Sequence, residues 1–569
     1  MTPGWLDRRE LRIGLGCMRL ADHGVETIAA AAKAGVTVFD TARAYEGNEE
    51  LLARALRDAG AERQARIVTK GGMARPAGAW VPDGRAKAIL AGCEASLAAL
   101  DGLEIDTFLL HAPDPRTPWR TSVRALARIG NEGLARRVGV CNVNRRQLDE
   151  ALELAPIAAV QVGLSPFDDR ALRGGVLERC ADAGIAVIAH SPLGGPNRAG
   201  RLARNDALAA VADALDASPA EVALAWLLGL SPAVVAIPGA RRPETARSAA
   251  AAARLRLDAD QAAAVGRAFG LARPARARPS RAAASADVVI VMGIPGAGKS
   301  RIADEHVARG HLRLNRDERG GSLRDVAGAL DDALAAGARE VVLDNTYLTR
   351  ATRNEVVEIA ARHGVSPRCI WLDTPLAQAQ INLVERLLDR CGSLPDPDTL
   401  RELVRHEPGL LTPTSQMRAV RELEPPADDE GFASVERRAF ARAPTPRGTV
   451  AGVFVAAAAL HRDGWEHVLA GAKPDAPHLV LDWNPDGDRT ALDDATHRLA
   501  AVVSGPIEAA LCAHAAGPPR CWCRPPLPGL VLAFARAHGV DPARSVFVGT
   551  GAAHRSMATA LGCQPLQPA

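Results

Sequence analysis

The chain has 569 residues, of which 47% are hydrophobic and 24% are charged, a composition typical of globular proteins and a length that suits roughly two to four domains. Its 69 basic and 66 acidic residues leave a net charge of +3, so bulk charge neither indicates nor excludes nucleic-acid binding, and a 3% aromatic content leaves few side chains for stacking on bases. The sequence opens without a signal-peptide pattern and contains no apolar run near the roughly 20 residues of a membrane span, so we expect a cytoplasmic protein without membrane contacts.

From Leu11 to about Arg273, short apolar runs alternate with helix-period stretches, which predicts repeated βα units in a (β/α)₈ TIM barrel. Each apolar run ends in polar residues. In such a barrel these ends would meet at one mouth, where barrel enzymes carry their chemistry. The polar ends are Asp40, Lys70, His111, Cys141–Asn142, Gln161, His190–Ser191 and Pro238–Gly239.

Four residues of this half have a defined chemical use together: Asp40, Tyr45, Lys70 and His111. A free tyrosine has a pKa of about 10, but a nearby ammonium lowers it, and an aspartate holds that ammonium in place. Tyr45 would then protonate a carbonyl oxygen while hydride reaches the carbon, and His111 would orient the carbonyl. The set therefore predicts reduction of a small carbonyl compound.

Six motifs carry a resemblance to one family: FDTARAYEGNE (39–49), VTK (68–70), LLH (109–111), GVCN (139–142), HSPL (190–193) and IPG (237–239). On these motifs residues 1–270 resemble an aldo-keto reductase. The resemblance implies NADPH as cofactor, although Ser248-Ala249 stands where the family usually has Glu-Asn near the adenine. It also implies the contacts of the cofactor: Asn142 and Gln161 for the carboxamide, Ser191 and Leu193 for the pyrophosphate side, and Gly239, Arg241 or Arg242 for the adenosine phosphate.

Residues 271–286 are rich in Pro, Ala and Arg, and we expect a solvated linker because few large apolar groups offset the ordering entropy. Residues 287–445 would form the next domain, where the apolar run Val288–Met292 leads into Gly-Ile-Pro-Gly-Ala-Gly-Lys-Ser (293–300) and a helix-compatible stretch. Gly293, Gly296 and Gly298 let backbone N–H groups converge on phosphate. Lys299 would reach the β and γ oxygens of ATP and Ser300 would bind Mg²⁺.

Later apolar runs of this domain also end in polar residues, as in doubly wound α/β sheets that bind ligands at their carboxyl edge. Phosphoryl transfer needs positioned phosphates, a metal, a group that accepts the hydroxyl proton and cations on the transferred oxygens. Asp317 would accept the proton, and Arg353 or Arg386 would supply the cation. Asp344 and Asn345 would hold the water of the metal or the nucleotide.

Three segments, Asn315-Arg-Asp317, Leu343-Asp-Asn-Thr346 and Glu424–Phe432, resemble those of P-loop polynucleotide 5′-hydroxyl kinases. The resemblance implies Asp317 as general base, Arg386 as an arginine of a helical lid that clamps the triphosphate, and nucleic-acid 5′-OH ends, DNA or RNA, as partners. The Arg- and Asn-rich lid helix of that family is here Gln380–Arg386. A small-molecule kinase on the same scaffold remains an alternative.

Residues 446–569 contain three cysteines and one histidine on a Pro/Gly-rich loop: Cys512, His514, Cys521 and Cys523. This set suits a closed tetrahedral Zn²⁺ site, and reduced cysteines that cluster by chance are the alternative. With Arg524–Gly529 and Ser545–Gly549, this region resembles the zinc-loop phosphatases of the haloacid dehalogenase (HAD) superfamily. Their catalytic aspartates are absent from the matching run Val453–Leu460, and Pro525, Thr550 and His554 replace a lysine and the magnesium-binding aspartates, so we expect a pseudophosphatase with a structural zinc.

Taken together, the motifs predict an α/β multidomain enzyme with two activities. It would reduce a small carbonyl compound, or the aldehyde of a damaged nucleic-acid end, with NADPH, and it would phosphorylate a 5′-OH end with ATP, in nucleic-acid repair. The alternatives are a reductase fused to a small-metabolite kinase and a kinase with non-catalytic binding domains. The sequence does not indicate an oligomeric state.

Overall fold

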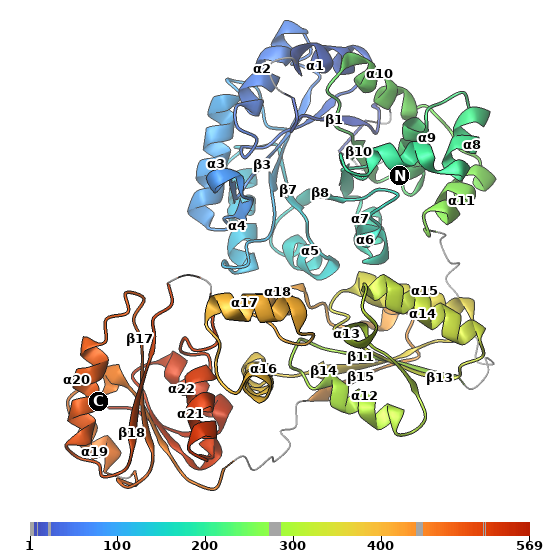
Figure 1. Ribbon diagram of the computed structural model, residues 1–569. Helices are drawn as coiled ribbons and strands as arrows, with labels where there is room; N and C mark the ends of the chain where they lie inside the picture. Colours follow the sequence, from blue (N-terminus) through green and yellow to red (C-terminus); the bar gives the residue numbers. More distant parts are fainter. Residues whose placement is uncertain are drawn as a thin grey trace. The chain divides into compact units, whose positions relative to one another are not determined.

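The computed structural model describes residues 5–7, 9–20, 24–271, 286–439, 448–470, 472–515, 517 and 519–568 (Figure 1). The chain divides into two compact units, one up to Ala277 and the other from Arg278 onward apart from Arg350–Asn354, and each is described by itself. The predicted linker at 271–286 lies almost entirely outside the described residues. Among the described helices, none is both long enough and apolar enough to cross a membrane.

The first unit is a closed barrel of parallel strands. In sheet order the strands are β1 (Gly14–Gly16), β2 (Val38–Asp40), β3 (Arg66–Gly71), β6 (Thr107–Leu110), β7 (Arg137–Cys141), β8 (Ile157–Gly163), β9 (Ala186–His190) and β10 (Val234–Ile237). Parallel bridges from Ile13 to Ala236 and from Gly16 to Gly239 close the ring between β1 and β10. The predicted (β/α)₈ barrel is confirmed.

Helices surround this barrel (Figure 1). They are α1 (Gly24–Lys33), α2 (Asn48–Asp58), α3 (Ala86–Ala99), α4 (Trp119–Asn131), α5 (Arg145–Leu152), α6 (Arg170–Arg173), α7 (Val176–Ala183), α8 (Asp206–Ala214), α9 (Pro219–Gly229), α10 (Pro243–Ala252) and α11 (Ala259–Ala268). Because strand side chains alternate between the two faces, Val38 and Leu109 fill the barrel interior while Phe39 and Phe108 pack under the helices. A hairpin of β4 (Met73–Ala74) and β5 (Val81–Pro82) follows β3.

The second unit begins with a five-stranded parallel sheet in the order β12-β13-β11-β14-β15. Its strands are β11 (Asp287–Met292), β12 (Leu312–Leu314), β13 (Glu340–Asp344), β14 (Arg368–Asp373) and β15 (Ser434–Ala439). The connections reverse direction at β11, which lies between β13 and β14, so the loop after β11 opens at a switch point of the sheet.

Helices cover both faces of this sheet. On one face lie α14 (Leu323–Ala335) and α15 (Arg350–Arg362), and on the other lie α12 (Lys299–Val307), α16 (Leu376–Cys391) and α18 (Pro413–Glu422). The short α13 (Arg316–Arg319) follows β12, and α17 (Pro397–His406) lies between α16 and α18 in the sequence. Adjacent residues of β11 illustrate the two cores, since Ile290 packs toward α14 and α15 and Val291 toward α12.

The last part of the chain forms another five-stranded parallel sheet, in the order β18-β17-β16-β19-β20. Its strands are β16 (Val453–Ala456), β17 (His478–Trp483), β18 (Ile507–Cys512), β19 (Val546–Val548) and β20 (Gln564–Leu566). One face packs against α19 (Trp465–Leu469) and α20 (Thr490–Ala500), and the other against α21 (Gly529–Ala537) and α22 (Ala552–Leu561). Helix α16 of the preceding sheet contributes Leu387 and Leu388 to the latter core, so these two sheets of the second unit share apolar packing.

Candidate functional site

The structure brings together the four residues that we expected to act on a carbonyl, at the carboxyl ends of β2, β3 and β6. The Nζ of Lys70 donates hydrogen bonds to Asp40 Oδ1 and to the carbonyl of Thr41, each at 2.7 Å, and lies 3.5 Å from the hydroxyl of Tyr45. The Tyr45 ring meets the His111 imidazole edge-on, with centroids 5.9 Å apart. This arrangement can hold a carbonyl oxygen near a phenol and an imidazole.

Burial decides the protonation states at this mouth. Desolvation alone would lower the pKa of Lys70, but Asp40 and the neighbouring phenol raise it above its usual value, so Lys70 is a cation. Our expectation that Lys70 lowers the pKa of Tyr45 needs correction, because desolvation of the phenol outweighs the ammonium and the pKa of Tyr45 is raised. Burial, with Lys70 and His190 adding to it, lowers the pKa of His111 to about 3. At neutral pH the phenol therefore keeps its proton and the imidazole is neutral.

Two buried polar residues, which our sequence analysis assigned no role, fix the loop that carries Tyr45. Asn48 accepts a hydrogen bond from the Thr41 hydroxyl at 2.7 Å, and Glu49 accepts one from the Thr69 hydroxyl at 2.5 Å. Both lie at the start of α2 and are almost fully buried. Because buried polar groups require partners, this network ties the loop after β2 to the end of β3. The sequence signal that could have identified them is their position at the end of the motif 39–49, close to Tyr45.

The residues predicted to hold a nicotinamide lie beside the same carboxylate. Gln161 donates from Nε2 to Asp40 Oδ2 at 2.6 Å. Asn142 donates from Nδ2 to the His111 carbonyl at 3.1 Å, and its Oδ1 lies 3.1 Å from Nε2 of His190. Asn142 is exposed and adopts a left-handed backbone conformation with φ of 55°, so the extended conformation of β7 ends at Cys141. Its amide is thus held at the edge of the mouth.

The remaining predicted cofactor contacts follow β9 and β10. Ser191 is exposed with φ of 51°, and Leu193 is half-buried in the loop after β9. Gly239, Arg241 and Arg242 are exposed after β10, and neither guanidinium forms an ion pair or side-chain hydrogen bond with any other described residue. Two adjacent guanidinium groups without carboxylate partners suit a phosphate, so these residues fit a 2′-phosphorylated dinucleotide.

Trp80, to which our sequence analysis assigned no role, stands next to the same mouth. It is 46% exposed and lies between the two strands of the β4–β5 hairpin. Its ring centroid is 6.1 Å from that of Tyr45 and 5.6 Å from that of His111, and the guanidinium of Arg75 lies 3.9 Å from its ring centre. An exposed aromatic face beside a proton donor offers an apolar wall to a carbonyl substrate.

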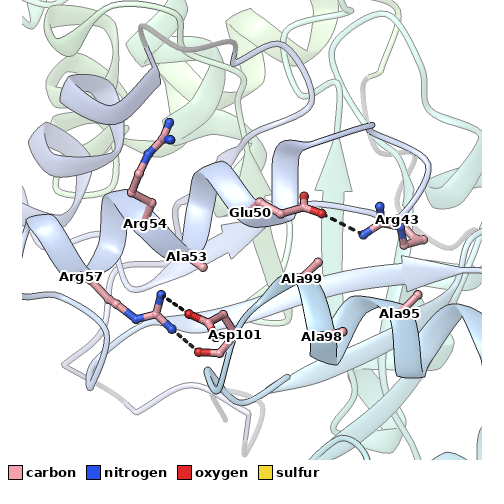
Figure 2. Close-up of a pocket in the computed structure, with 9 residues that line it drawn as sticks. All are labelled: Arg43, Glu50, Ala53, Arg54, Arg57, Ala95, Ala98, Ala99 and Asp101. Carbon is pink, nitrogen blue, oxygen red and sulfur yellow. Dashed lines mark hydrogen bonds and ion pairs between the residues drawn. The ribbon is translucent and has the colours of Figure 1, made fainter.

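The barrel also carries a hollow of about 670 Å³ on its outer helices, between α2 and α3 (Figure 2). Arg57 forms an ion pair with Asp101 at 3.2 Å and Arg43 forms one with Glu50 at 3.5 Å, and all four residues line the hollow. None of the residues predicted to act on a carbonyl lines this hollow. It is therefore separate from the mouth that holds Tyr45.

The loop after β11 has the backbone of a phosphate cradle. Gly293, Gly296 and Gly298 have positive φ values of 154°, 85° and 91°, a region that side chains with a Cβ rarely adopt. Lys299 begins α12 and curls over the loop, donating to the carbonyl of Gly293 at 3.2 Å and to that of Ile294 at 3.1 Å. The ammonium therefore lies over the loop, where it can exchange these carbonyls for phosphate oxygens.

Charged groups gather around this loop. Burial lowers the pKa of Lys299 to about 8, the positive charge of Arg386 adds to the lowering, and the negative charges of Asp344 and Asp317 oppose it. Ser300, the second residue of α12, is exposed, so its hydroxyl is accessible to a metal ion. The predicted residues of phosphoryl transfer thus share one electrostatic environment.

Two asparagines set the position of Asp317. Asn315 caps α13 by accepting from the backbone N–H of Asp317 at 2.7 Å, and its amide donates to the carbonyl of Asp344 at 2.8 Å. Asn345 accepts from the backbone N–H of Arg316 at 2.9 Å. These bonds join the end of β12 to the end of β13. The side chain of Asp317 is 44% exposed, so its carboxylate is accessible to a substrate.

The two arginines predicted as cations differ in setting. Arg386, on α16, donates to the carbonyl of Gly409 at 3.0 Å, and burial lowers its pKa. A Cβ placed on Gly409 would lie 3.2 Å from the same guanidinium nitrogen and 4.0 Å from Asp317 Oδ2, so Gly409 lies beside both groups. Arg353, on α15, is fully buried. Arg386 is therefore the arginine that lies next to Asp317.

The four predicted zinc ligands converge. Cys512 Sγ lies 3.4 Å from Cys523 Sγ, 3.7 Å from Cys521 Sγ and 3.4 Å from His514 Nδ1, and His514 Nδ1 lies 3.2 Å from Cys523 Sγ. A tetrahedral zinc with Zn–S bonds of about 2.3 Å and Zn–N bonds of about 2.0 Å separates its ligand atoms by roughly 3.5 to 3.8 Å. The four separations, 3.2 to 3.7 Å, equal this spacing or are at most about 0.3 Å shorter, so a small outward shift would admit Zn²⁺, and no disulfide forms among these cysteines.

The end of β16 is the place where we expected the catalytic aspartates of a phosphatase to be absent. Val455 and Ala456 close the strand, and the short 3-10 helix Ala457–Ala459 follows, with Ala457 and Ala459 fully buried. Near the end of β19 the backbone N–H of Thr550 donates to His554 Nδ1 at 3.2 Å. Alanine methyl groups offer no nucleophile and no metal ligand.

A second cluster of ligand-type side chains, Asp287, His306 and His311, lies at the opposite, amino end of β11. Both oxygens of Asp287 accept from the guanidinium of Arg368, at 2.8 and 2.7 Å, and His311 Nε2 lies 3.0 Å from Oδ2. Arg368 lowers the pKa of Asp287 to about 2. A bidentate guanidinium already neutralises this carboxylate, so the cluster is explained as an ion-pair network of the sheet.

Known proteins resemble the chain in two regions. Residues 12–268 match the model of the aldo/keto reductase family, and residues 288–396 match that of an AAA domain, a P-loop fold. An aldo-keto reductase of Mycolicibacterium vanbaalenii is 33% identical over 271 residues, which cover 47% of this chain and 90% of the relative. Aldo-keto reductase str7 of Strobilurus tenacellus is 28% identical over 279 residues, covering 44% and 82%. The solved aldo/keto reductase from Klebsiella pneumoniae in complex with NADP and acetate is 28% identical, with 45% of this chain and 91% of that chain covered and a TM-score of 0.40.

Proposed function

We propose, on the premise that this chain belongs through residues 12–268 to the aldo/keto reductase family, that its barrel reduces an aldehyde or ketone with NADPH. The observation that carries the proposal is the contact of Lys70 with Asp40 and Tyr45 beside a neutral His111. Bound NADPH would supply the hydride to the carbonyl carbon.

The side chains of the barrel divide the remaining work. Tyr45 keeps its proton at neutral pH and transfers it to the carbonyl oxygen as that oxygen gains charge. Lys70 stabilises the phenolate that results, and Asp40 holds the ammonium in place. His111, neutral and beside the phenol, orients the carbonyl by donating a hydrogen bond.

NADPH is favoured over NADH by the charges beyond β10. Arg241 and Arg242 are exposed and have no carboxylate partner among the described residues, which suits the 2′-phosphate. Asn142 and Gln161 would hold the carboxamide, and Ser191 and Leu193 the pyrophosphate side.

The test is loss of NADPH absorbance by the purified protein with a panel of small aldehydes, with Tyr45→Phe as the variant. We expect turnover in the wild type and a loss of about 10²- to 10⁴-fold in Tyr45→Phe with unchanged NADPH affinity. Turnover that survives in Tyr45→Phe would refute the assignment.

A second function, supported by the match of residues 288–396 to a P-loop domain, is phosphorylation of a nucleic-acid 5′-OH end by ATP. Asp317 would take the proton of the hydroxyl as its oxygen attacks the γ-phosphorus and the bond to the β-phosphate oxygen breaks, releasing ADP. Lys299 and Arg386 would balance the charge on the phosphates. Ser300 would hold Mg²⁺, which would neutralise negative charge on the phosphates.

The kinase assay measures transfer of the γ-phosphate from ATP to DNA and RNA oligonucleotides with 5′-OH ends. Asp317→Asn should abolish the transfer and keep ATP affinity, since Asp317 binds no part of the nucleotide in this scheme. If ATP binds but neither oligonucleotide is phosphorylated, the alternative of a small-metabolite kinase takes its place. If the wild-type protein does not bind ATP, both the polynucleotide kinase and the small-metabolite kinase proposals are contradicted.

For the last domain we propose a pseudophosphatase of the HAD type with a structural zinc. The support is the spacing of the four ligand atoms together with the alanines after β16. Metal analysis of the purified protein should give one zinc per chain, and Cys512→Ser should lose it. Release of phosphate from phosphorylated oligonucleotides by the wild type would contradict the loss of activity.

The fusion of a reductase with an end kinase suggests one role, in nucleic-acid repair. Broken strands carry sugar aldehydes, so the barrel would reduce an aldehyde at a damaged end and the P-loop domain would phosphorylate the 5′-OH end. A preference for an aldehyde-bearing oligonucleotide over the free sugar aldehyde supports this role, and equal kcat/KM values for the two would refute it.

A further inference from the structure

Two of the three predicted zinc-ligating cysteines, Cys521 and Cys523, flank a tryptophan that reaches into the P-loop domain. Trp522, between Cys521 and Cys523, is only 2% exposed. Its Nε1 donates a hydrogen bond to the carbonyl of Leu411 at 2.9 Å. Leu411 belongs to the lid segment, residues 407–412, which connects α17 to α18. A buried indole N–H with one defined acceptor fixes the distance between the cysteines and this segment.

The lid segment in turn holds the arginine of the proposed kinase site. Arg386 donates to the carbonyl of Gly409 at 3.0 Å, and Arg390 donates to that of Pro408 at 2.6 Å. Gly409 adopts φ of 80°, and a Cβ placed on it would lie 3.2 Å from the Arg386 guanidinium and 4.0 Å from Asp317 Oδ2. Leu410 is buried in the same apolar cluster as Trp522. Thus a single residue, Leu410, separates the carbonyl held by Trp522 from the carbonyl that orients Arg386.

Helix α16 is held between the phosphate loop and the last domain. Toward the loop, Asn382 donates to the carbonyl of Gly296 at 2.8 Å, and a Cβ on Gly296 would come within 2.3 Å of the carbonyl oxygen of Ala379. Toward the last domain, Gln378 donates to the carbonyl of Ala560 at 2.5 Å and Asp389 pairs with Arg536 at 2.7 Å. With both sides fixed, the position of Arg386 depends on the last domain.

We propose that Trp522 is a positioning residue of the phosphoryl-transfer site: the metal-bound cysteines hold it against the Leu411 carbonyl, and the lid segment thereby holds Arg386 beside Asp317. The last domain, which lacks catalytic carboxylates, then serves the kinase as the fixed wall of its lid. This inference rests on the proposed kinase function and on the zinc site. It gives the four predicted zinc ligands a role that does not depend on phosphatase activity.

The test compares two tryptophan variants in the full chain. Trp522→Phe keeps the ring and removes the N–H that reaches Leu411. Trp483→Phe is the matched control. Trp483 Nε1 donates at 2.9 Å to the carbonyl of His514, so this substitution removes an equivalent hydrogen bond within the same metal site. Both variants should keep one zinc per chain and the wild-type reductase rate.

Hydrogen exchange of residues 407–412 reports on the segment without any catalysis. We expect Trp522→Phe to speed exchange there by about three- to tenfold, the effect of one lost hydrogen bond, and Trp483→Phe to leave it unchanged. Removal of zinc from the wild type by a chelator should reproduce the effect of Trp522→Phe. Unchanged exchange in Trp522→Phe, or an equal change in both variants, overturns the proposal.

Phosphate transfer then separates this inference from the function on which it rests. In Trp522→Phe, kcat should fall about three- to tenfold while KM for the acceptor stays the same, and in an Arg386→Ala background the same substitution should add nothing. Full additivity in the double variant overturns the route through Arg386. If the wild type transfers no phosphate to any acceptor but exchange at 407–412 depends on Trp522 and zinc, the kinase proposal fails and the structural coupling stands.

Discussion

Replacement of Lys70 by methionine should destabilise the barrel strongly, beyond its effect on catalysis. The side chains of Lys70 and Asp40 are 0% and 5% exposed and their charged atoms are 2.7 Å apart. Methionine fills a similar volume but leaves the Asp40 carboxylate buried without its cation. Removal of one partner of a buried pair typically costs about 3 to 5 kcal/mol.

The size of the effect can be read as a melting temperature. For a domain of about 150 to 250 residues, 1 kcal/mol shifts Tm by about 2 to 4 °C, so Lys70→Met should lower the Tm of the barrel transition by roughly 6 to 20 °C. The folded pKa of Lys70 lies above the unfolded value of 10.5, so its contribution is fully present below that pH and is lost only at higher pH. The loss in Tm should therefore be the same at pH 6 and at pH 8.

Scanning calorimetry of Lys70→Met, Asp40→Asn and the double variant separates stability from chemistry. The double variant removes both charges, so it should recover most of the lost Tm, whereas reductase activity stays low because the phenolate of Tyr45 has no ammonium beside it. A Tm within 2 °C of wild type for Lys70→Met, a threshold of about 1 kcal/mol, would refute the view that this pair is buried and mutually dependent. Equal Tm losses in the single and double variants would refute the coupling between the two charges.

The remaining predictions concern charge and pH at the two sites. Arg241→Ala with Arg242→Ala should weaken NADPH by about 10- to 100-fold and leave NADH affinity unchanged, measured by fluorescence titration; equal losses for both cofactors would contradict a phosphate contact. Since the pKa of Lys299 is about 8, ATP affinity should be constant below pH 8 and weaken by up to about tenfold per pH unit above it, in calorimetric titrations; a flat profile to pH 9 would contradict this. With His111 neutral down to about pH 3, the reductase pH profile should show no step near pH 6.5, and a step that disappears in His111→Gln would contradict the buried, neutral imidazole.

The barrel and its mouth could be predicted from the sequence because the signal is local. Each apolar run is followed at once by the residue that the strand presents at its carboxyl end, so alternation and chain order were enough to gather Lys70, His111 and Gln161 at one place. The exposed edge strand β15 was missed for the converse reason. Half of the residues in Ser434–Ala439 are charged and most are exposed, and strand periodicity appears only where one face is buried.

What the sequence could not give is the balance of opposing effects at a buried site. The ammonium of Lys70 does act on Tyr45 as expected, but the desolvation of the phenol is larger, and desolvation depends on packing that no motif encodes. The same holds for Trp80, whose ring is brought to Tyr45 by a hairpin that lies far outside the motif 39–49.

The last domain shows the limit most clearly. The cysteines were recognisable from their spacing, but the tryptophan between them looked like part of a ligand loop until its indole was placed against Leu411, more than a hundred residues earlier in the chain. Because the domain lacks the catalytic carboxylates, the sequence predicted a pseudophosphatase with a structural zinc. If this domain supports the position of Arg386, as we propose, one role explains both its lack of catalytic carboxylates and the four ligand-type side chains that bring Trp522 to Leu411.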